Sequence, residues 1–350
     1  MSSRYGGKAV MAKVRAKSSR RLTENQYREL LRAEDYTSLL ERIATLTPYG
    51  EVLPGVSTLE LERQAPQKAL RRSLTGCYRE FLRYDPLPNS FYRYVILELE
   101  VAELVRLLRR LRASSMPVTA PSFPEELLPF TDLDFTALAE VRDLTELREL
   151  LKGTPYAVAL TVAPENAGEP EDFLRLEAAL QQHYVAAVLD LIAVLPQSGE
   201  RQRLKRYFGS WCELQNLSLL YRLKATDLSP AYIESLLLPH FGELRPREWR
   251  TLMESADQEG FLTALGETNL GRKLGDLKAT PLLNRGFFEL CTTRRHFHNS
   301  MLLLRFAAEG PSAFMAYIML QQIEVQNLVT MLEGAYYHSD ALHLEPLLVY

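Results

Sequence analysis

The stretch QQIEVQNLVTMLEGAYY, residues 321–337, decides the fold because the chain contains it more than once. Residues 211–225, WCELQNLSLLYRLKA, carry Glu, Gln, Asn and Leu in the same order and spacing. A third copy, ELEVAELVRLLRRLRA at residues 98–113, keeps the Glu and the Leu but has Glu103 where the others have Asn. Apolar side chains recur in each copy at steps of three and four residues, which is typical of amphipathic helix. The sequence therefore predicts three helices with the same pattern, one in each copy.

A second motif repeats in step with the first. Residues 35–53 (DYTSLLERIATLTPYGEVL) match residues 143–160 (DLTELRELLKGTPYAVAL), and residues 257–274 (DQEGFLTALGETNLGRKL) keep the Asp, the apolar spacing and a Thr. The Asp lies 65, 70 and 67 residues before the Glu of the helix motif (35 to 100, 143 to 213, 257 to 324). Each Asp follows an aromatic residue by eight positions and a leucine by five: Tyr27, Phe135 and Trp249, and Leu30, Leu138 and Leu252.

The repeat has a period of about 110 residues, which is the length of a small domain. Solenoid repeats are shorter, at roughly 20–50 residues, so a solenoid is excluded. We therefore predict an all-α fold of three similar helical domains, at residues 1–118, 119–228 and 229–350. Three such domains can stack in a line or close around a pseudo-threefold axis. Closure buries both terminal faces, and it is the arrangement we expect.

Local signals agree with helices. Thr23 followed by Gln26 predicts a capping box that opens a helix at residues 24–32. The two Thr-Pro-Tyr triplets, at residues 47–49 and 154–156, predict helix ends because proline disfavours helical geometry in the preceding residue. Residues 154–163, TPYAVALTVA, form the one short candidate for a strand. Two loops rich in Pro and Ser, at residues 114–124 and 163–170, separate the helical blocks.

The N-terminus carries seven bases before its first acid, Glu24. A first helix with Ala9, Ala12 and Ala16 on one face and its bases in water accounts for this segment. A transit peptide or a nucleic-acid-binding arm stays open as an alternative.

Composition excludes several classes of protein. The formal net charge of −3 gives no global signal for nucleic acid or for a phospholipid surface. The longest apolar stretch, residues 184–195, contains Asp190 and is shorter than the roughly 20 residues that span a bilayer, so we expect no membrane insertion. The three cysteines, an odd number without a CxxC pair, indicate a reducing compartment and buried packing roles: Cys77, Cys212 and Cys291.

No motif for catalysis survives inspection. GETNLGRK (residues 266–273) has two glycines at the spacing of a phosphate-binding loop, but Arg272 stands in place of the Lys that such a loop requires. HFH (residues 296–298) lies beside two arginines and lacks a third ligand at metal spacing. We therefore predict that the chain is not an enzyme and has no catalytic residues, no cofactor and no metal.

The repeated polar residues of the helix motif are the candidate partner-binding site: Glu100, Glu213, Glu324, Asn216 and Asn327. If the three glutamates face the axis, they form a ring of acids around a central opening and meet bases on a partner. Alternatively, each glutamate serves only its own domain, where it pairs with a local base or caps a neighbouring helix.

Taken together, KVRAKSSRRLT, TPYGEVL and the closing run PSAFMAYIMLQQIEVQNLVTMLEG (residues 311–334) resemble the C subunit of A/V-type rotary ATPases, which is the d subunit of the eukaryotic proton pump. The resemblance runs from Tyr5 to Leu348. It departs from the family at Glu103, in the missing Pro-Tyr of the third copy, and in the Ala-Tyr-Tyr that follows Gly334 in place of a base.

The resemblance implies a funnel of three helical domains that catalyses nothing. Such a protein is a central-stalk part of the rotor, peripheral on the cytoplasmic face of the membrane. Its partners are the central shaft subunits and the membrane proteolipid ring, and it couples rotation to the ATP-linked transport of H⁺ or Na⁺. A generic helical adaptor or scaffold, and a helical enzyme with a hidden site, stay open as alternatives.

Overall fold

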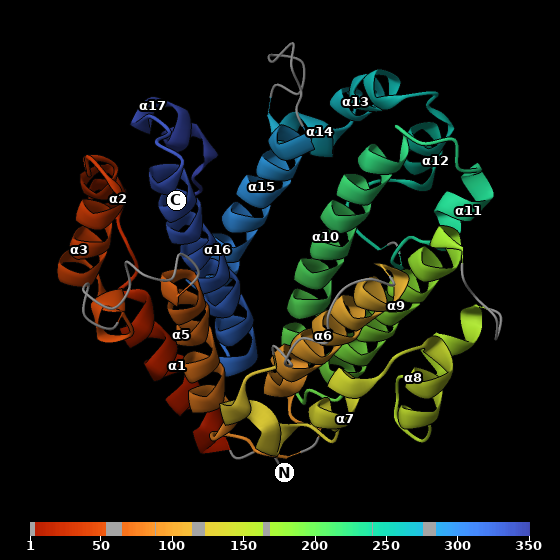
Figure 1. The fold of residues 1–350 in the computed structure, drawn as a ribbon, viewed down its shortest axis with the longest axis horizontal. Coiled ribbons are helices and arrows are strands. Elements are labelled where there is room, and N and C mark those ends of the chain that lie inside the picture. The colour runs from red at the N-terminus through yellow and green to blue at the C-terminus, as the bar shows by residue number, and fades with distance from the viewer. Residues whose placement is uncertain are drawn as a thin grey trace. The chain divides into compact units, whose positions relative to one another are not determined.

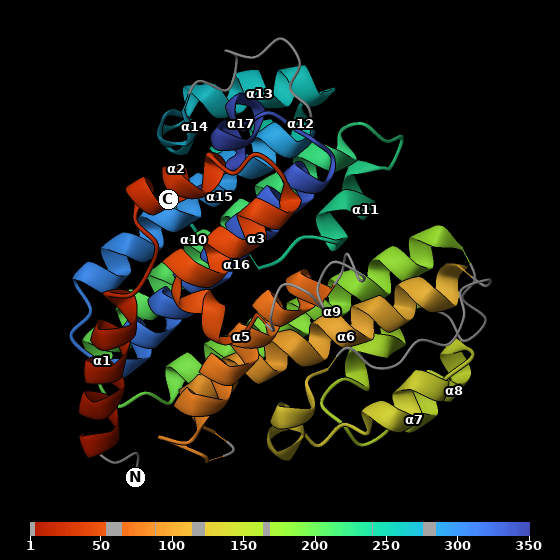
Figure 2. The same ribbon diagram turned by 60° about the vertical axis from the view of Figure 1, so that its left-hand side comes forward.

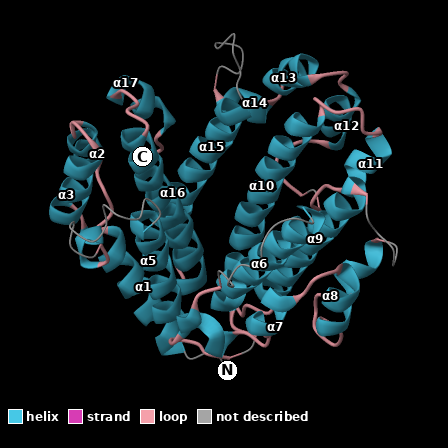
Figure 3. Cartoon of the chain, viewed as in Figure 1, coloured by secondary structure: helices cyan, strands magenta, loops and turns pink. Residues whose placement is uncertain are grey.

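The computed structural model describes residues 4–53, 65–87, 89–113, 123–163, 169–239, 241–275 and 285–350. Every regular element in these ranges is an α-helix or a 3₁₀-helix, as the colouring of Figure 3 shows. The predicted all-α class is confirmed. Among the same residues, no helix combines the length and the hydrophobicity needed to cross a membrane. Of the two loops rich in Pro and Ser, residues 114–122 and 164–168 lie outside the described residues.

The helices group into two compact units, which are described separately. The first unit joins both ends of the sequence, Met1–Pro86 and Glu289–Tyr350. Its longest helix, α16 (Gly310–Tyr336), packs against α1 (Arg4–Ser18), α5 (Ala65–Leu82) and α3 (Tyr36–Leu46). Figures 1 and 2 show these helices from two directions. The remaining elements of this unit are α2 (Glu24–Leu31), η1 (Pro48–Glu51), α17 (Ala341–Leu344), η5 (Glu345–Leu347) and most of α15 (Arg285–Arg305).

The second unit comprises Leu87–Phe288. Its frame is α9 (Pro170–Ala193), which packs against both α6 (Tyr94–Ala113) and α10 (Ser198–Leu223). Shorter helices cover this frame: η2 (Phe91–Arg93), η3 (Glu125–Phe130), α7 (Phe135–Glu140), α8 (Leu144–Leu150), η4 (Val158–Val162), α11 (Pro230–Ser235), α12 (Pro246–Glu254), α13 (Gln258–Glu267) and α14 (Asn269–Leu274).

The second sequence motif folds into three similar lobes. Lobe 1 (residues 22–53) contains α2, α3 and η1, lobe 2 (residues 123–162) runs from η3 to η4, and lobe 3 (residues 241–274) contains α12 to α14. In each lobe the repeated Asp is the N-cap of the second α-helix and accepts a hydrogen bond from the backbone N–H three residues later, at Ser38, Glu146 and Gly260. An N-cap of this kind satisfies a donor that the helix itself leaves unpaired, which explains the repeated Asp.

The repeated Thr also has a common local role. The hydroxyls of Thr47, Thr154 and Thr268 each donate to a carbonyl of the last helical turn before them. Gly50 and Gly271 stand three residues after their Thr, and a Cβ at either position would overlap the carbonyl of the turn before it. The second glycine of GETNLGRK is therefore explained by helix packing, because only glycine lets the chain pass this close.

Other sequence expectations have mixed outcomes. The Thr23–Gln26 capping box is present and opens α2. Residues 154–163 form no strand; η4 lies there instead. The expected face of α1 is wrong, because its three alanines are exposed while Val10 and Val14 are fully buried. The larger side chains bury more apolar surface than alanine, so they decide which face of the helix packs.

Candidate functional site

The five predicted partner-binding residues lie on three long helices, with Glu100 on α6, Glu213 and Asn216 on α10, and Glu324 and Asn327 on α16. All five side chains are at most 5% exposed. A buried carboxylate is strongly unfavourable unless hydrogen bonds or charges compensate it. The partners of each group therefore decide what it does.

Glu324 binds lobe 1. One carboxylate oxygen accepts the backbone N–H of Leu22 at 2.8 Å, and the other accepts the hydroxyl of Tyr49 at 2.8 Å and the amide of Gln321 at 3.2 Å. Nε of Arg21 lies 3.7 Å from the carboxylate, and the guanidinium of Arg21 stacks over the ring of Phe297 at 5.5 Å. Burial raises the pKa of Glu324, and the bond from Leu22 and the charge of Arg21 oppose that rise.

Glu100 occupies the same place in the second unit. The hydroxyls of Thr131 and Tyr156, both in lobe 2, donate to its two carboxylate oxygens. Burial raises the pKa of Glu100, and these two hydrogen bonds oppose the rise. Tyr156 is the tyrosine of the second Thr-Pro-Tyr triplet, as Tyr49 is that of the first.

Glu213 accepts hydrogen bonds from the backbone of lobe 3. The consecutive N–H groups of Glu243 and Leu244, at the start of lobe 3, each donate to one of its oxygens at 2.8 Å. A Cβ at Gly242 would overlap the Glu213 carboxylate. The glycine thus lets the chain come close enough for two backbone donors to replace the tyrosine that lobe 3 lacks.

The two asparagines each hold one residue of backbone. Asn216 accepts the N–H of Leu238 at 2.8 Å and donates to its carbonyl at 2.9 Å. Asn327 accepts the N–H of Val349 at 3.1 Å and donates to its carbonyl at 2.7 Å. Glu103, at the corresponding position of α6, forms an ion pair with Arg106 on its own helix.

The five residues therefore bind the chain's own lobes and connecting segments, and their role as partner contacts stays a prediction. The sequence indicates the carboxylates but not their donors, because Tyr49 and Tyr156 stand in triplets that locally mark only helix ends. The signal was available: the Thr-Pro-Tyr triplet and the glutamate repeat in the same order, and a buried carboxylate needs donors.

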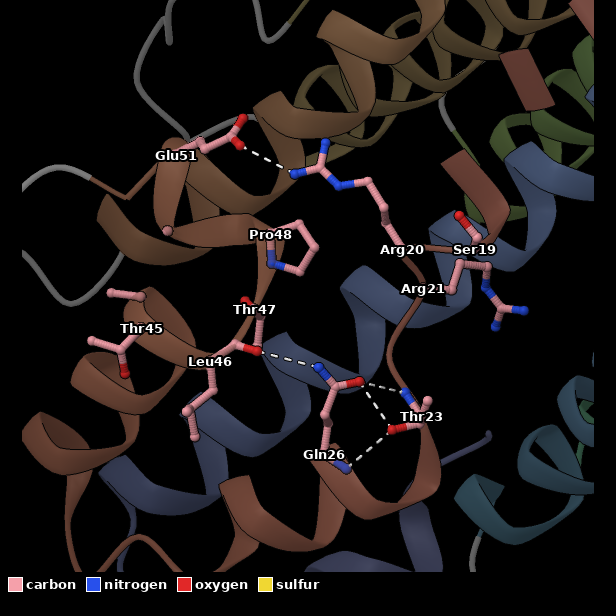
Figure 4. A pocket seen from close by; sticks show the side chains of 12 residues that line it. Ser19, Arg20, Arg21, Thr23, Gln26, Thr45, Leu46, Thr47, Pro48 and Glu51 are labelled. Atoms are coloured by element: carbon pink, nitrogen blue, oxygen red, sulfur yellow. Dashed lines mark hydrogen bonds and ion pairs between the residues drawn. The ribbon is translucent and has the colours of Figure 1, made fainter. Parts of the chain in front are cut away.

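A surface depression of about 640 Å³ lies beside lobe 1, between residues 19–26 and residues 44–51 (Figure 4). Its polar side chains bond to each other: Gln26 accepts from the N–H and the hydroxyl of Thr23 at 2.9 Å and donates to the carbonyl of Leu46 at 3.2 Å. Arg20 forms an exposed ion pair with Glu51 at 3.2 Å. These contacts are capping and surface interactions, and they bring no nucleophile or acid–base pair together.

The sequence candidates for chemistry have structural explanations. His296 is buried on α15 and burial lowers its pKa to about 4, while His298 is exposed, so the two imidazoles do not face one site. In the described parts of the chain, no group of three His, Cys, Asp or Glu side chains is arranged to hold a metal ion.

Comparison with known proteins identifies relatives along nearly the whole chain. Residues 10–343 match the family model described as the ATP synthase (C/AC39) subunit. The chain is 25% identical to the C subunit of the A-type ATP synthase of Methanothermobacter thermautotrophicus over 268 residues, which cover 76% of this chain and 66% of that relative. The matched segment thus spans just under two thirds of that protein. The C subunits of the A-type ATP synthases of Methanobrevibacter smithii (24% identity; 91% of this chain, 81% of the relative) and Methanocaldococcus jannaschii (22%; 93% and 82%) match at greater length.

The resemblance found in the sequence is thereby confirmed. The matched family is a non-catalytic structural subunit, which agrees with the prediction that the chain is not an enzyme. The low identity fits a fold in which helical periodicity and a few buried polar contacts are enough to place the lobes. With a match that leaves out only a few residues at each end, the chain belongs to the ATP synthase (C/AC39) subunit family.

Proposed function

We propose that the chain is the central-stalk C subunit of a V/A-type rotary ATPase, where it couples the rotating shaft to the membrane proteolipid ring during ATP-linked transport of H⁺ or Na⁺. It is peripheral on the cytoplasmic face of the membrane, as part of the complex. The observation that carries this proposal is the match of residues 10–343 to the subunit family. The threefold repeat within the chain supports a pseudo-threefold arrangement of the three domains.

The construction of the chain suits a part that transmits torque. The helix α16 has 27 residues and α10 has 26, which at 1.5 Å per residue are each about 40 Å long. Each of three long helices is fixed to a lobe by a buried, fully bonded carboxylate. Satisfied polar contacts in a protein interior are rigid and directional, so lobe and helix transmit load together.

The five candidate residues enter this proposal as supports of a partner surface. Because their side chains are buried and bonded within the chain, we propose that they position the lobes that meet shaft or ring. Their replacement is then expected to lower the stability of the lobes, and assembly weakens only under conditions in which a lobe opens.

The test is purification of the intact complex through an affinity tag on this chain, from detergent-solubilised membranes of its own cells. The expected result is that shaft and proteolipid subunits copurify in fixed proportion and that the isolated chain binds no ATP in calorimetry. Recovery of the tagged chain without either partner, or with unrelated proteins, would support the generic adaptor. ATP binding by the isolated chain would contradict the non-catalytic role.

A further inference from the structure

The three carboxylates do not bind the lobes of their own sequence repeats. Glu100 lies in the first repeat and binds Tyr156 in the second, 56 residues later. Glu213 lies in the second repeat and binds Leu244 in the third, 31 residues later. Glu324 lies in the third repeat and binds Leu22 in the first, 302 residues earlier. Each long helix therefore closes on the following lobe, and the last helix closes on the first lobe.

The few residues that lead into a lobe are called its entry segment. The two asparagines show where this segment lies. Leu238, held by Asn216, precedes in the chain the two residues that bind Glu213 at the start of lobe 3. Val349, held by Asn327, lies at the same distance from its asparagine, 22 residues. By this equivalence, Val349 occupies the position in space that leads into lobe 1. In sequence, however, lobe 1 begins at Leu22, near the other end of the chain.

An aromatic stack supports the same equivalence independently. In lobe 2, Phe123 stacks on Phe135 with ring centroids 4.1 Å apart and an interplanar angle of 11°. In lobe 1, the ring of Tyr27 is stacked by Tyr350 from the other end of the sequence, with ring centroids 4.6 Å apart and an interplanar angle of 14°. Tyr27 and Phe135 are equivalent positions, eight residues before the repeated Asp. Tyr350 therefore takes in lobe 1 the place that Phe123 takes in lobe 2.

A base at the end of the long helix also holds lobes 2 and 3, whereas at the end of α2 in lobe 1 the carbonyl of Glu29 accepts a hydrogen bond at 3.1 Å from Arg42 of the lobe itself. Arg110, near the end of α6, donates to the carbonyls of Ala139 and Val141 at the end of α7, both at 2.8 Å. Lys224, just after α10, donates to the carbonyls of Met253 and Ser255 at the end of α12, both at 2.6 Å. A cation at these carbonyls complements the negative end of the helix. The corresponding stretch of α16 is Ala-Tyr-Tyr, which has no base.

We propose that residues 344–350, the C-terminal strap, are the entry segment of lobe 1 carried at the other end of the sequence, and that the strap is a latch whose release opens lobe 1 alone. The inference does not depend on the proposed function. In lobes 2 and 3 the entry segment continues directly into the lobe, so chain connectivity keeps it near its site. Residues 54–343 separate lobe 1 from the strap in sequence, so non-covalent contacts keep the strap at its site.

The strap is held along its length. Leu344 lies over Gly334, where a Cβ would overlap it, and the carbonyl of Pro346 accepts a hydrogen bond from Arg294 at 2.5 Å. Leu348 is 4% exposed and belongs to the core that lobe 1 shares with α16. Removal of the strap thus uncovers Tyr27 and this core, which lowers the free energy of a local opening of α2 and α3.

The experiment is hydrogen exchange of the full chain, followed by mass spectrometry, in wild type, Tyr350→Ala and a variant that lacks residues 345–350. The exposed Tyr337→Ala is the control. We expect the deletion to speed exchange of α2 and α3 at least tenfold and Tyr350→Ala to do so to a smaller extent, while α7 and α13 keep wild-type rates. Wild-type exchange in α2 and α3, or an equal rise in all three lobes, would overturn the latch. If the deletion variant does not fold, Tyr350→Ala decides by the same criterion.

Discussion

The hydroxyl of Tyr49 donates a 2.8 Å hydrogen bond to the carboxylate of Glu324, although 275 residues separate the two in sequence. Burial raises the pKa of Tyr49 well above its usual value, so the hydroxyl keeps its proton and stays a donor. The same pairing of tyrosine and glutamate joins Tyr156 to Glu100 in the second unit. A buried acid with a neutral donor is thus the recurrent joint between a long helix and a lobe.

This joint predicts a dependence of stability on pH. Burial raises the folded-state pKa of Glu100 and of Glu324 above 4.5. Between 4.5 and the raised value the folded state binds more protons than the unfolded state. Stability from these groups is therefore fully present below pH 4.5 and is lost as pH rises through the folded pKa.

The double variant Glu100→Gln/Glu324→Gln removes this dependence, because an amide does not ionise. The melting temperature of the variant minus that of wild type should therefore become more positive as pH rises from 4.5 towards 8. Thermal melts at each pH measure it, with the exposed Glu333→Gln as control. If this difference in melting temperature stays constant, or becomes more negative as pH rises, the raised pKa values are contradicted.

Gly242→Ala should destabilise the protein by about 1–3 kcal/mol, because the new Cβ overlaps the Glu213 carboxylate in a packed site. Gly76→Ala is the matched control, since this glycine is exposed within α5 and a Cβ there meets nothing within 4 Å. It should stabilise by about 1 kcal/mol, the cost of glycine in a helix. Urea denaturation measures the free energy of unfolding of both variants. Equal changes in the two would show that close approach to Glu213 is not the reason for glycine at position 242.

The three cysteines should be unreactive in the native protein. Burial raises the pKa of the Cys77 and Cys212 thiols to about 12 and also raises that of Cys291. The thiolate is the reactive form, so at pH 8 very little of it is present. A thiol reagent should label none of the three in minutes under native conditions and all three after unfolding in guanidinium. Rapid native labelling would show that a cysteine is accessible.

Much of the fold could be predicted because helices have a strong local signal. The spacing of apolar residues in the three copies and the Thr23–Gln26 pair depend on neighbours in sequence, and the structure confirms both. The face of α1 could not be predicted from its alanines, because the choice depends on what Val10 and Val14 gain by burial against other helices. The three-domain division at residues 118 and 228 stays a prediction.

The candidate site was harder to predict. Glu213 lies at the edge of an apolar stripe, where periodicity alone does not distinguish a solvent-facing acid from a buried one. Its burial depends on Gly242 and on two backbone N–H groups about 30 residues away. Likewise, no local pattern indicates that Glu324 binds the first lobe and not its own. Repeats reveal which residues are equivalent, whereas the partner of each residue depends on how the repeats are connected in space.

Asn216→Leu distinguishes support of the fold from direct contact with a partner. Leucine has the same number and branching of side-chain heavy atoms as asparagine but cannot bond the N–H and carbonyl of Leu238, which lose their partners at 2.8 and 2.9 Å. A buried polar group left unpaired costs about 1–3 kcal/mol, so the loss for two groups should be about 2–6 kcal/mol. The exposed neighbour Gln215→Leu is the control, because it changes the same helix without unpairing that backbone. If Asn216 supports lobe 3, urea denaturation shows this loss, and the folded variant binds the shaft with wild-type affinity at low temperature. Weakened binding by a variant of unchanged stability would instead assign Asn216 to the partner surface.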